Sequence, residues 1–265
     1  MKIRWAESSF SARKFAAFLL LIASPLLGQN APKPGPLPTV QQVMEHYVEA
    51  MGGRDAIFQH KSMTVRGKTE VSGGGPVLDS ISYYKDGKML YDVTLADGRH
   101  YLEGYDGAVA WRIHPKNGPA VFEGNVVKSK ARDADMYYPA RILDYFSSME
   151  VVEVTDFEGH TCYHLKGTNK WGIVNEQFFD VTSGLLVGYR FNSKWRGGPG
   201  DEHEVFSEYK KFGGWLMPTD DMHKSTDGTQ TDRILSVTFD DVADSVFVLP
   251  APIKEVLARK GQGSS

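Results

Sequence analysis

Between about Ser62 and Asp240, hydrophobic and polar residues alternate in short segments that are separated by glycine-containing turns. These turns are Asp86-Gly87, Asp97-Gly98, Asp106-Gly107, Glu158-Gly159, Ser183-Gly184, Gly213-Gly214 and Asp227-Gly228. Two-residue turns of this kind connect antiparallel strands in hairpins. The pattern therefore predicts one antiparallel sheet in which neighbours along the sequence lie side by side.

The predicted strands fall into two meanders. In the first, Met89, Tyr91, Val93 and Leu95 share one face of their strand, as expected for a half-buried strand. Its strands are predicted at Ser62–Val71, Val77–Lys85, Lys88–Leu95, His100–Tyr105 and Ala108–His114. The second meander is predicted at Met149–Phe157, His160–Gly167, Ile173–Asp180, Leu185–Trp195, His203–Phe212, Trp215–His223 and Gln230–Asp240.

Helical spacing replaces this alternation in a few places. Thr39 and Gln42 have the spacing of a capping box, and apolar residues then recur at helical intervals until Gly52-Gly53. A shorter helical piece is predicted at Arg54–His60. Between the meanders, Asn125–Met136 has no period of two, and Ala140–Phe146 places its apolar residues at helical spacing, which predicts one or two inserted helices. Glu255–Lys260 is predicted to form a last helical turn.

A sheet with so many strands accumulates twist and is expected to curl into a barrel or half-barrel, which the helical segments are available to plug. Its concave wall would enclose a ligand cavity, and the helical insert would act as a lid. The candidate cavity residues are Met89, Tyr91, Val93, Trp111, Tyr163, Leu165, Tyr189, Phe191, Leu235, Val237 and Phe239. The candidate lid residues are Ile142, Leu143 and Phe146. For the tryptophans in or beside the strands, a role in the core or next to a hairpin is favoured over direct contact with a ligand; these are Trp111, Trp171, Trp195 and Trp215.

The N-terminal 28 residues resemble a signal peptide, because a basic stretch precedes a short apolar run that begins at Phe15. The alternative, an uncleaved anchor, is disfavoured because the run is shorter than the roughly 20 residues that span a bilayer. Residues 29–38 are rich in proline and are predicted to form an extended linker. We expect one domain at 39–250, a tail at 251–265, and an exported protein with only peripheral membrane contact.

Charge and cysteine content narrow the function further. Without residues 1–28 the chain keeps 26 basic and 32 acidic residues, a net charge of −6, and it has no basic run of the kind that binds nucleic acid. Cys162 is the sole cysteine, so no internal disulfide forms, and we expect it to be buried. No cysteine follows the expected cleavage site, which argues against a lipid anchor.

No sequence motif indicates catalysis, a metal or a cofactor. His160 and His164 would lie about 13 Å apart on a strand, too far to share an ion. No nucleophile elbow or phosphate-binding loop is present. Paired acids such as Asp220-Asp221 and Asp240-Asp241 are typical of strand ends, although paired-acid hydrolysis stays open without geometry.

Several short motifs, in this order, resemble the LolA-like superfamily of outer-membrane lipoprotein-sorting proteins. They are Met51-Gly52-Gly53-Arg54, Glu103-Gly104-Tyr105-Asp106-Gly107 followed by Trp111, Phe179-Asp180-Val181-Thr182-Ser183-Gly184-Leu185-Leu186-Val187, and Tyr209-Lys210-Lys211-Phe212-Gly213-Gly214-Trp215-Leu216-Met217-Pro218. The resemblance implies a curved antiparallel half-barrel closed by helices, with an apolar cavity that holds acyl chains. It also implies a lid-locking arginine, for which Arg54, Arg66 and Arg112 are eligible.

We therefore expect a non-catalytic periplasmic carrier for a lipid or a lipid-modified protein. An envelope sensor or protein-interaction module of the same fold is the alternative, and a hydrolase or isomerase that uses the cavity is a third hypothesis. Each buried methylene contributes about 0.8 kcal/mol, so an apolar cavity can bind an acyl chain without specific polar contacts.

Overall fold

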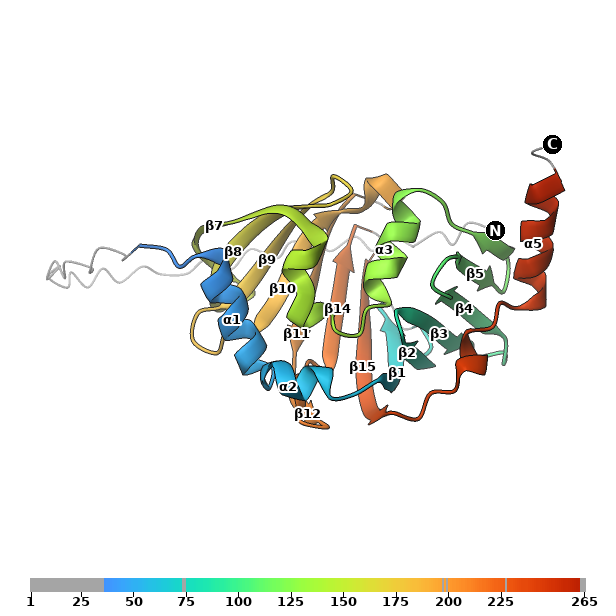
Figure 1. The fold of residues 1–265 in the computed structure, drawn as a ribbon, viewed down its shortest axis with the longest axis horizontal. Coiled ribbons are helices and arrows are strands. Elements are labelled where there is room, and N and C mark those ends of the chain that lie inside the picture. Colours follow the sequence, from blue (N-terminus) through green and yellow to red (C-terminus); the bar gives the residue numbers. More distant parts are fainter. Residues whose placement is uncertain (1–35, 73–74, 197, 199, 227, 263–265) are drawn as a thin grey trace, which may run out of the picture. The chain divides into compact units, whose positions relative to one another are not determined.

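The computed structural model describes residues 36–72, 75–196, 198, 200–226 and 228–262, and these form one compact unit (Figure 1). The predicted signal peptide and most of the predicted linker lie outside the described residues.

Two helices open the described chain, α1 (Val40–Ala50) and α2 (Gly53–Phe58). The predicted capping box is confirmed: Thr39 Oγ1 accepts a hydrogen bond from the Gln42 amide at 3.2 Å, and Gln42 Oε1 accepts one from the Thr39 amide at 2.8 Å. Because apolar residues recur at helical spacing, α1 buries Val43, Met44 and Tyr47 on one side.

The strands form a 13-stranded antiparallel sheet and a small two-stranded sheet. In the first half the strands are β1 (Ser62–Val71), β2 (Leu78–Lys85), β3 (Lys88–Thr94), β4 (His100–Tyr105), β5 (Ala110–His114) and β6 (Gly118–Val121). In the second half they are β7 (Phe146–Phe157), β8 (His160–Asn169), β9 (Val174–Asp180), β10 (Leu186–Asn192), β11 (Asp201–Ser207), β14 (Asp220–Ser225) and β15 (Gly228–Phe239). The small sheet pairs β12 (Lys210–Phe212) with β13 (Trp215–Met217).

The strand order of the large sheet is β6-β5-β4-β3-β2-β1-β15-β14-β11-β10-β9-β8-β7. Within each meander, strands that follow one another in sequence pair with each other, as predicted. The first and last strands in sequence, β1 and β15, also pair with each other, and this pairing joins the two meanders in the middle of the sheet. The sheet curves and stays open, with β6 and β7 at its edges, as Figure 1 shows. The predicted fold class, a large curved antiparallel sheet with few helices, is confirmed.

Two predicted strands are each divided in the structure. The segment His203–Phe212 becomes β11 and β12, and Trp215–His223 becomes β13 and β14. Glu208 breaks the first segment by adopting a φ of +54°, a conformation that ends a strand. Pro218 lies between the other two strands and has no N–H to donate to a ladder. The hairpin β12–β13 therefore leaves the large sheet.

The inserted segment between the meanders is helical, as predicted. It contains α3 (Asn125–Asp133), α4 (Tyr138–Arg141) and a 3₁₀ turn at Ile142–Tyr145. In Figure 1, α1, α2 and α3 lie across one face of the curved sheet, which we call the inner face. A large apolar core fills the space beneath α1 and the insert, and its fully buried members include Ile57, Leu165, Phe179 and Trp215.

The opposite, outer face has its own small cluster around Phe157, Cys162 and Phe178. Burial raises the pKa of the Cys162 thiol to about 12, and the carboxylates of Asp180 and Asp156 add to the shift. Cys162 is thus buried, as predicted, and serves as a small apolar side chain.

The C-terminal residues pack on the sheet rather than leaving it. Helix α5 (Ala251–Gln262) lies against β6 and buries Ile253 completely. It is longer than the predicted turn at Glu255–Lys260. Just before it, the Val242 carbonyl accepts a hydrogen bond from Lys85 Nζ at 3.2 Å.

Candidate functional site

A groove of about 390 Å³ lies on the inner face where β1–β3 meet β14 and β15, and we call it the inner groove. Tyr84, Met89 and Tyr91 line one side, and Phe206 and Met217 lie across from them. Strand alternation places these residues on one face, because Tyr84 pairs with Met89 and Ser82 pairs with Tyr91. The volume is within the range of about 300–1,000 Å³ that is typical of small-molecule sites.

The floor of the inner groove is polar. Asp221 on β14 lies opposite Asp232 on β15, and both line the groove. Asp232 accepts a hydrogen bond from Thr69 Oγ1 and another from Gln230 Nε2 at 2.8 Å. Asp221 Oδ1 is buried and has no hydrogen-bond partner among the described residues. The groove thus combines apolar walls with a carboxylate floor.

Burial raises the pKa of Asp221 well above its ordinary value, and the nearby carboxylates of Glu204 and Asp232 raise it further. A carboxyl group in this environment favours the neutral, protonated form, because a charge would be poorly solvated and would repel its neighbours. The floor therefore carries less negative charge than its residue types suggest.

Replacing Asp221 by asparagine should remove a pH dependence of stability. Because its pKa is higher in the folded state, Asp221 stabilises the fold fully below about pH 4, the ordinary carboxyl value, and this contribution declines as the pH rises toward the raised pKa. Asp221→Asn should be about 1–3 kcal/mol more stable than the native chain at the upper end of that range. Urea unfolding across pH tests this, with the exposed Asp79→Asn as control; parallel curves for the native chain and Asp221→Asn would contradict it.

Two smaller cavities adjoin each other beneath α3, and we call them together the polar cavity. Their volumes are about 130 and 190 Å³, and both are lined by Arg132, Asp133, Asn175 and Tyr189. Arg132 Nε donates to Asp133 Oδ1 at 3.1 Å, and the guanidinium lies 5.6 Å from the centre of the Tyr138 ring. Although burial alone would lower it, the pKa of Arg132 is raised by Asp133, Tyr138 and Tyr189, so the cation is retained.

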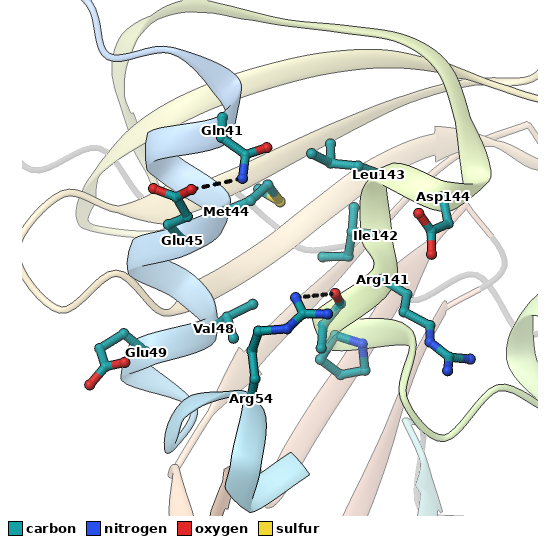
Figure 2. A pocket seen from close by; sticks show the side chains of 12 residues that line it. Gln41, Met44, Glu45, Val48, Glu49, Arg54, Arg141, Ile142, Leu143 and Asp144 are labelled. Atoms are coloured by element: carbon teal, nitrogen blue, oxygen red, sulfur yellow. Dashed lines mark hydrogen bonds between the residues drawn. The ribbon is translucent and has the colours of Figure 1, made fainter. Parts of the chain in front are cut away.

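A third space, of about 400 Å³, separates α1 from the insert, and we call it the helix seam (Figure 2). Met44 and Val48 face Ile142 and Leu143 across it, with charged side chains at its rim. Arg54 reaches across the seam and its Nη1 donates to the Ala140 carbonyl at 3.4 Å. Of the three eligible lid-locking arginines, Arg54 thus contacts the insert.

The predicted cavity residues occupy several environments. Met89 and Tyr91 line the inner groove, and Val93 lies on the same face of β3. Tyr189 and Phe191 line the polar cavity. The remaining inner-face residues pack in or against the large core: Tyr163, Leu165, Val237 and Phe239.

Two of the candidate cavity residues are placed elsewhere. Trp111 pairs with Gly104, which pairs with Leu90, so it faces away from Met89 and Tyr91. Leu235 is 59% exposed, because the bulge opposite Arg66 and Gly67 interrupts the alternation of β15. The structure does not bring either residue to the inner groove.

The predicted lid residues lie at the junction of the insert with the sheet. Ile142 is buried in the large core and Leu143 packs against that core, and both line the helix seam. Phe146 is the first residue of β7 and lines the polar cavity.

Our emphasis on apolar residues missed the polar side chains of the inner face. These are Arg132, Asn175, Gln177, Glu204, Asp221 and Asp232. A signal was present in the sequence, because Asn175 and Gln177 alternate with Phe179 and therefore share its buried face. Buried polar side chains nearly always have hydrogen-bond partners, so two of them on one buried face predict a place where such partners are needed.

Within the residues described, no group of three or more His, Cys, Asp or Glu side chains is arranged to hold a metal ion. His164 lies 3.4 Å from carboxylates of both Glu153 and Glu176, on the outer face. None of the helices in the described ranges has the length and apolar character needed to cross a membrane.

Comparison with known proteins gives a match in structure but not in sequence. No family model matches the sequence, and no curated protein matches it. A LolA superfamily protein from Nitrosomonas europaea superimposes with a TM-score of 0.54 at 14% identity, over 80% of this chain and 99% of that one. A DUF1329 family protein from Desulfovibrio piger has a TM-score of 0.56 at 14% identity, over 80% and 98%.

A candidate outer membrane lipoprotein-sorting protein domain from Vibrio parahaemolyticus has a TM-score of 0.54 at 14% identity, over 82% of this chain and 98% of that one. These likenesses extend over most of this chain and agree with the resemblance found in the sequence. The chain therefore has the fold of the LolA-like superfamily.

Proposed function

We propose that this protein is a non-catalytic periplasmic binding or carrier protein that holds the acyl chain of a lipid or a lipid-modified protein in the inner groove. The observation that carries the proposal is the groove itself, an open space of about 390 Å³ with apolar walls on the inner face of the sheet. The LolA-like fold supports it, because proteins named for lipoprotein sorting share this architecture.

The distribution of apolar residues argues for the inner groove rather than for the space beneath α1. Beneath α1, core side chains fill the inner face, and Leu165 and Phe179 are fully buried there. At β1–β3, by contrast, Met63, Val65 and Met89 line the inner groove. Burial of a methylene chain would therefore be most favourable between β1–β3 and Met217.

Filling the groove with a bulky side chain tests the proposal. Ser82 lines the groove between Val65 and Tyr91, so Ser82→Trp should place an indole where the ligand chain would lie. We expect delipidated native protein to bind 11-(dansylamino)undecanoic acid saturably, and Ser82→Trp to weaken this at least about tenfold, since two lost methylene contacts amount to about 1.6 kcal/mol.

Ser236→Trp is the matched control. Ser236 pairs with Arg66 and so faces away from Val65 and Val237, on the outer face. This variant should bind the probe as the native chain does. Absence of saturable binding by the native protein, or equal binding by Ser82→Trp, would refute the proposed site.

A further inference from the structure

The polar cavity contains buried acceptors that the protein itself does not satisfy. Gln177 is 4% exposed and lines the cavity, and its Oε1 has no hydrogen-bond partner among the described residues. Its side chain makes a hydrogen bond to Tyr138, which partly offsets the rise that burial causes in the Tyr138 pKa. Asn175 Oδ1 is likewise buried, and no described residue donates to it.

An unsatisfied buried acceptor destabilises the fold, and two such atoms at alternate positions of one strand mark a site that a ligand would complete. Asn175 and Gln177 lie two residues apart on β9 and point to the same face. Both therefore present acceptors to the same space beneath Arg132.

The charges around the cavity select the kind of group that fits. Glu204 and Asp133 line it together with the Arg132 guanidinium. An anionic head group would face the two carboxylates, and an ammonium group would face the guanidinium. A hydroxyl group both donates and accepts hydrogen bonds. It can therefore donate to the amide oxygens and the carboxylates, and accept from the guanidinium.

The polar cavity adjoins the inner groove. Tyr189 lines the cavity and Phe206 lines the groove, and their rings pack edge to face with centres 5.3 Å apart. Tyr189 also pairs with Glu204 across the strands, and Phe206 pairs with Asp221. The two spaces are therefore neighbours separated by this pair of rings, and an elongated molecule that occupies both would lie across them.

We propose that the polar cavity binds the neutral, hydroxyl-bearing head group of an amphiphile whose chain lies in the inner groove. The proposal rests on the proposed function and adds the chemistry of the head group. Gln177 and Asn175 accept hydrogen bonds from its hydroxyls, and Arg132 donates to them.

Four amphiphiles with ten-carbon chains and different head groups test this by calorimetry below their micelle concentrations. The probes are decyl β-glucoside, 1-decanoylglycerol, decanoate and decyltrimethylammonium. We expect one or both of the neutral hydroxylated probes to bind at least about tenfold more tightly than the two ions, the ratio that one or two hydrogen bonds provide. A preference for the glucoside alone indicates a sugar head, and equal preference for the glycerol ester indicates a smaller polyol.

Two variants separate the two proposals. Gln177→Leu should weaken the hydroxylated probes to the level of decanoate and leave decanoate unchanged, whereas Ser82→Trp should weaken all four by a similar factor. Gln177→Leu should still unfold cooperatively, because leucine fills a similar volume and the removal of an unsatisfied oxygen offsets the loss of the hydrogen bond to Tyr138.

Equal affinity of the native protein for all four probes would overturn the head-group proposal and leave the proposed function intact. A preference for the hydroxylated probes that survives in Gln177→Leu would overturn the assignment of this cavity. Absence of binding by every probe would refute both proposals.

Discussion

Trp215→Ala should lower the free energy of unfolding by about 3–5 kcal/mol, the cost of emptying a large aromatic site in a packed core. Trp215 is 2% exposed and belongs to the large core with Met51 of the α1 end and Ile57 of α2. Its ring also stacks near Phe239, with centres 6.4 Å apart. Removing it would therefore loosen the contact between the hairpin β12–β13 and the N-terminal helices.

Guanidinium unfolding followed by circular dichroism measures this effect without relying on tryptophan fluorescence. Trp215→Phe is the matched control, because Trp215 Nε1 has no partner among the described residues and its loss breaks no hydrogen bond. We expect the phenylalanine substitution to lower the free energy of unfolding by on the order of 1 kcal/mol. If alanine and phenylalanine cost the same, the volume of the side chain is not what stabilises this junction.

Gly52→Ala should lower the free energy of unfolding by about 3 kcal/mol or more, because the alanine would have a strained backbone and would also clash with a neighbouring carbonyl group. Gly52 has a φ of +112°, where an L-residue is strained, and a Cβ added there would lie 2.5 Å from the Gly214 carbonyl oxygen. That oxygen belongs to the backbone of the hairpin, so relief requires the hairpin or the helices to move. The Leu216 amide donates to the Met51 carbonyl at 2.8 Å in the same contact.

Gly53→Ala separates the two penalties. Gly53 also has a positive φ, of +84°, but its added Cβ would meet only Glu49 Oε2 at an ordinary 3.7 Å. This substitution should lower the free energy of unfolding by about 1–2 kcal/mol, because it introduces only the strain of the left-handed conformation. Thermal unfolding of both variants beside the native chain gives the comparison, and equal losses would show that the approach of Gly214 is unimportant.

The contact between the N-terminal helices and the hairpin involves two of the motifs in which the sequence resembles the LolA-like superfamily. Met51-Gly52-Gly53-Arg54 and Gly213-Gly214-Trp215 are separated by more than half of the domain in sequence, yet they meet in space. Their glycines permit a close backbone contact between the N-terminal helices and the hairpin. The sequence order alone could not show that these motifs contact each other.

Much of the local structure could be predicted from the sequence. Alternating residues and glycine turns identified most strands to within a few residues, and the capping box at Thr39 marked the start of α1. The short strand β6 was missed, because Gly118 and Pro119 are typical of loops. The division of two strands at Glu208 and Pro218 was missed because one unusual φ and one missing donor have little effect on the hydrophobic pattern.

The candidate site was less predictable. The pattern placed Met89, Tyr91, Tyr189 and Phe191 on the inner face, and each lines an open space there. It could not tell which inner-face residues line a groove and which pack beneath α1, because both classes are apolar and alternate alike. Leu235 shows a further limit, since a single bulge reverses the side of the strand on which a residue lies.

By itself, the sequence determined the antiparallel meanders, the helical insert between them and the LolA-like resemblance, because hairpins and helices depend on contacts between near neighbours in the chain. Only the tertiary structure decided that β1 and β15 join the meanders, that the large core packs beneath α1, and that the inner groove has a polar floor. These features depend on contacts between residues far apart in sequence, which a local pattern does not encode.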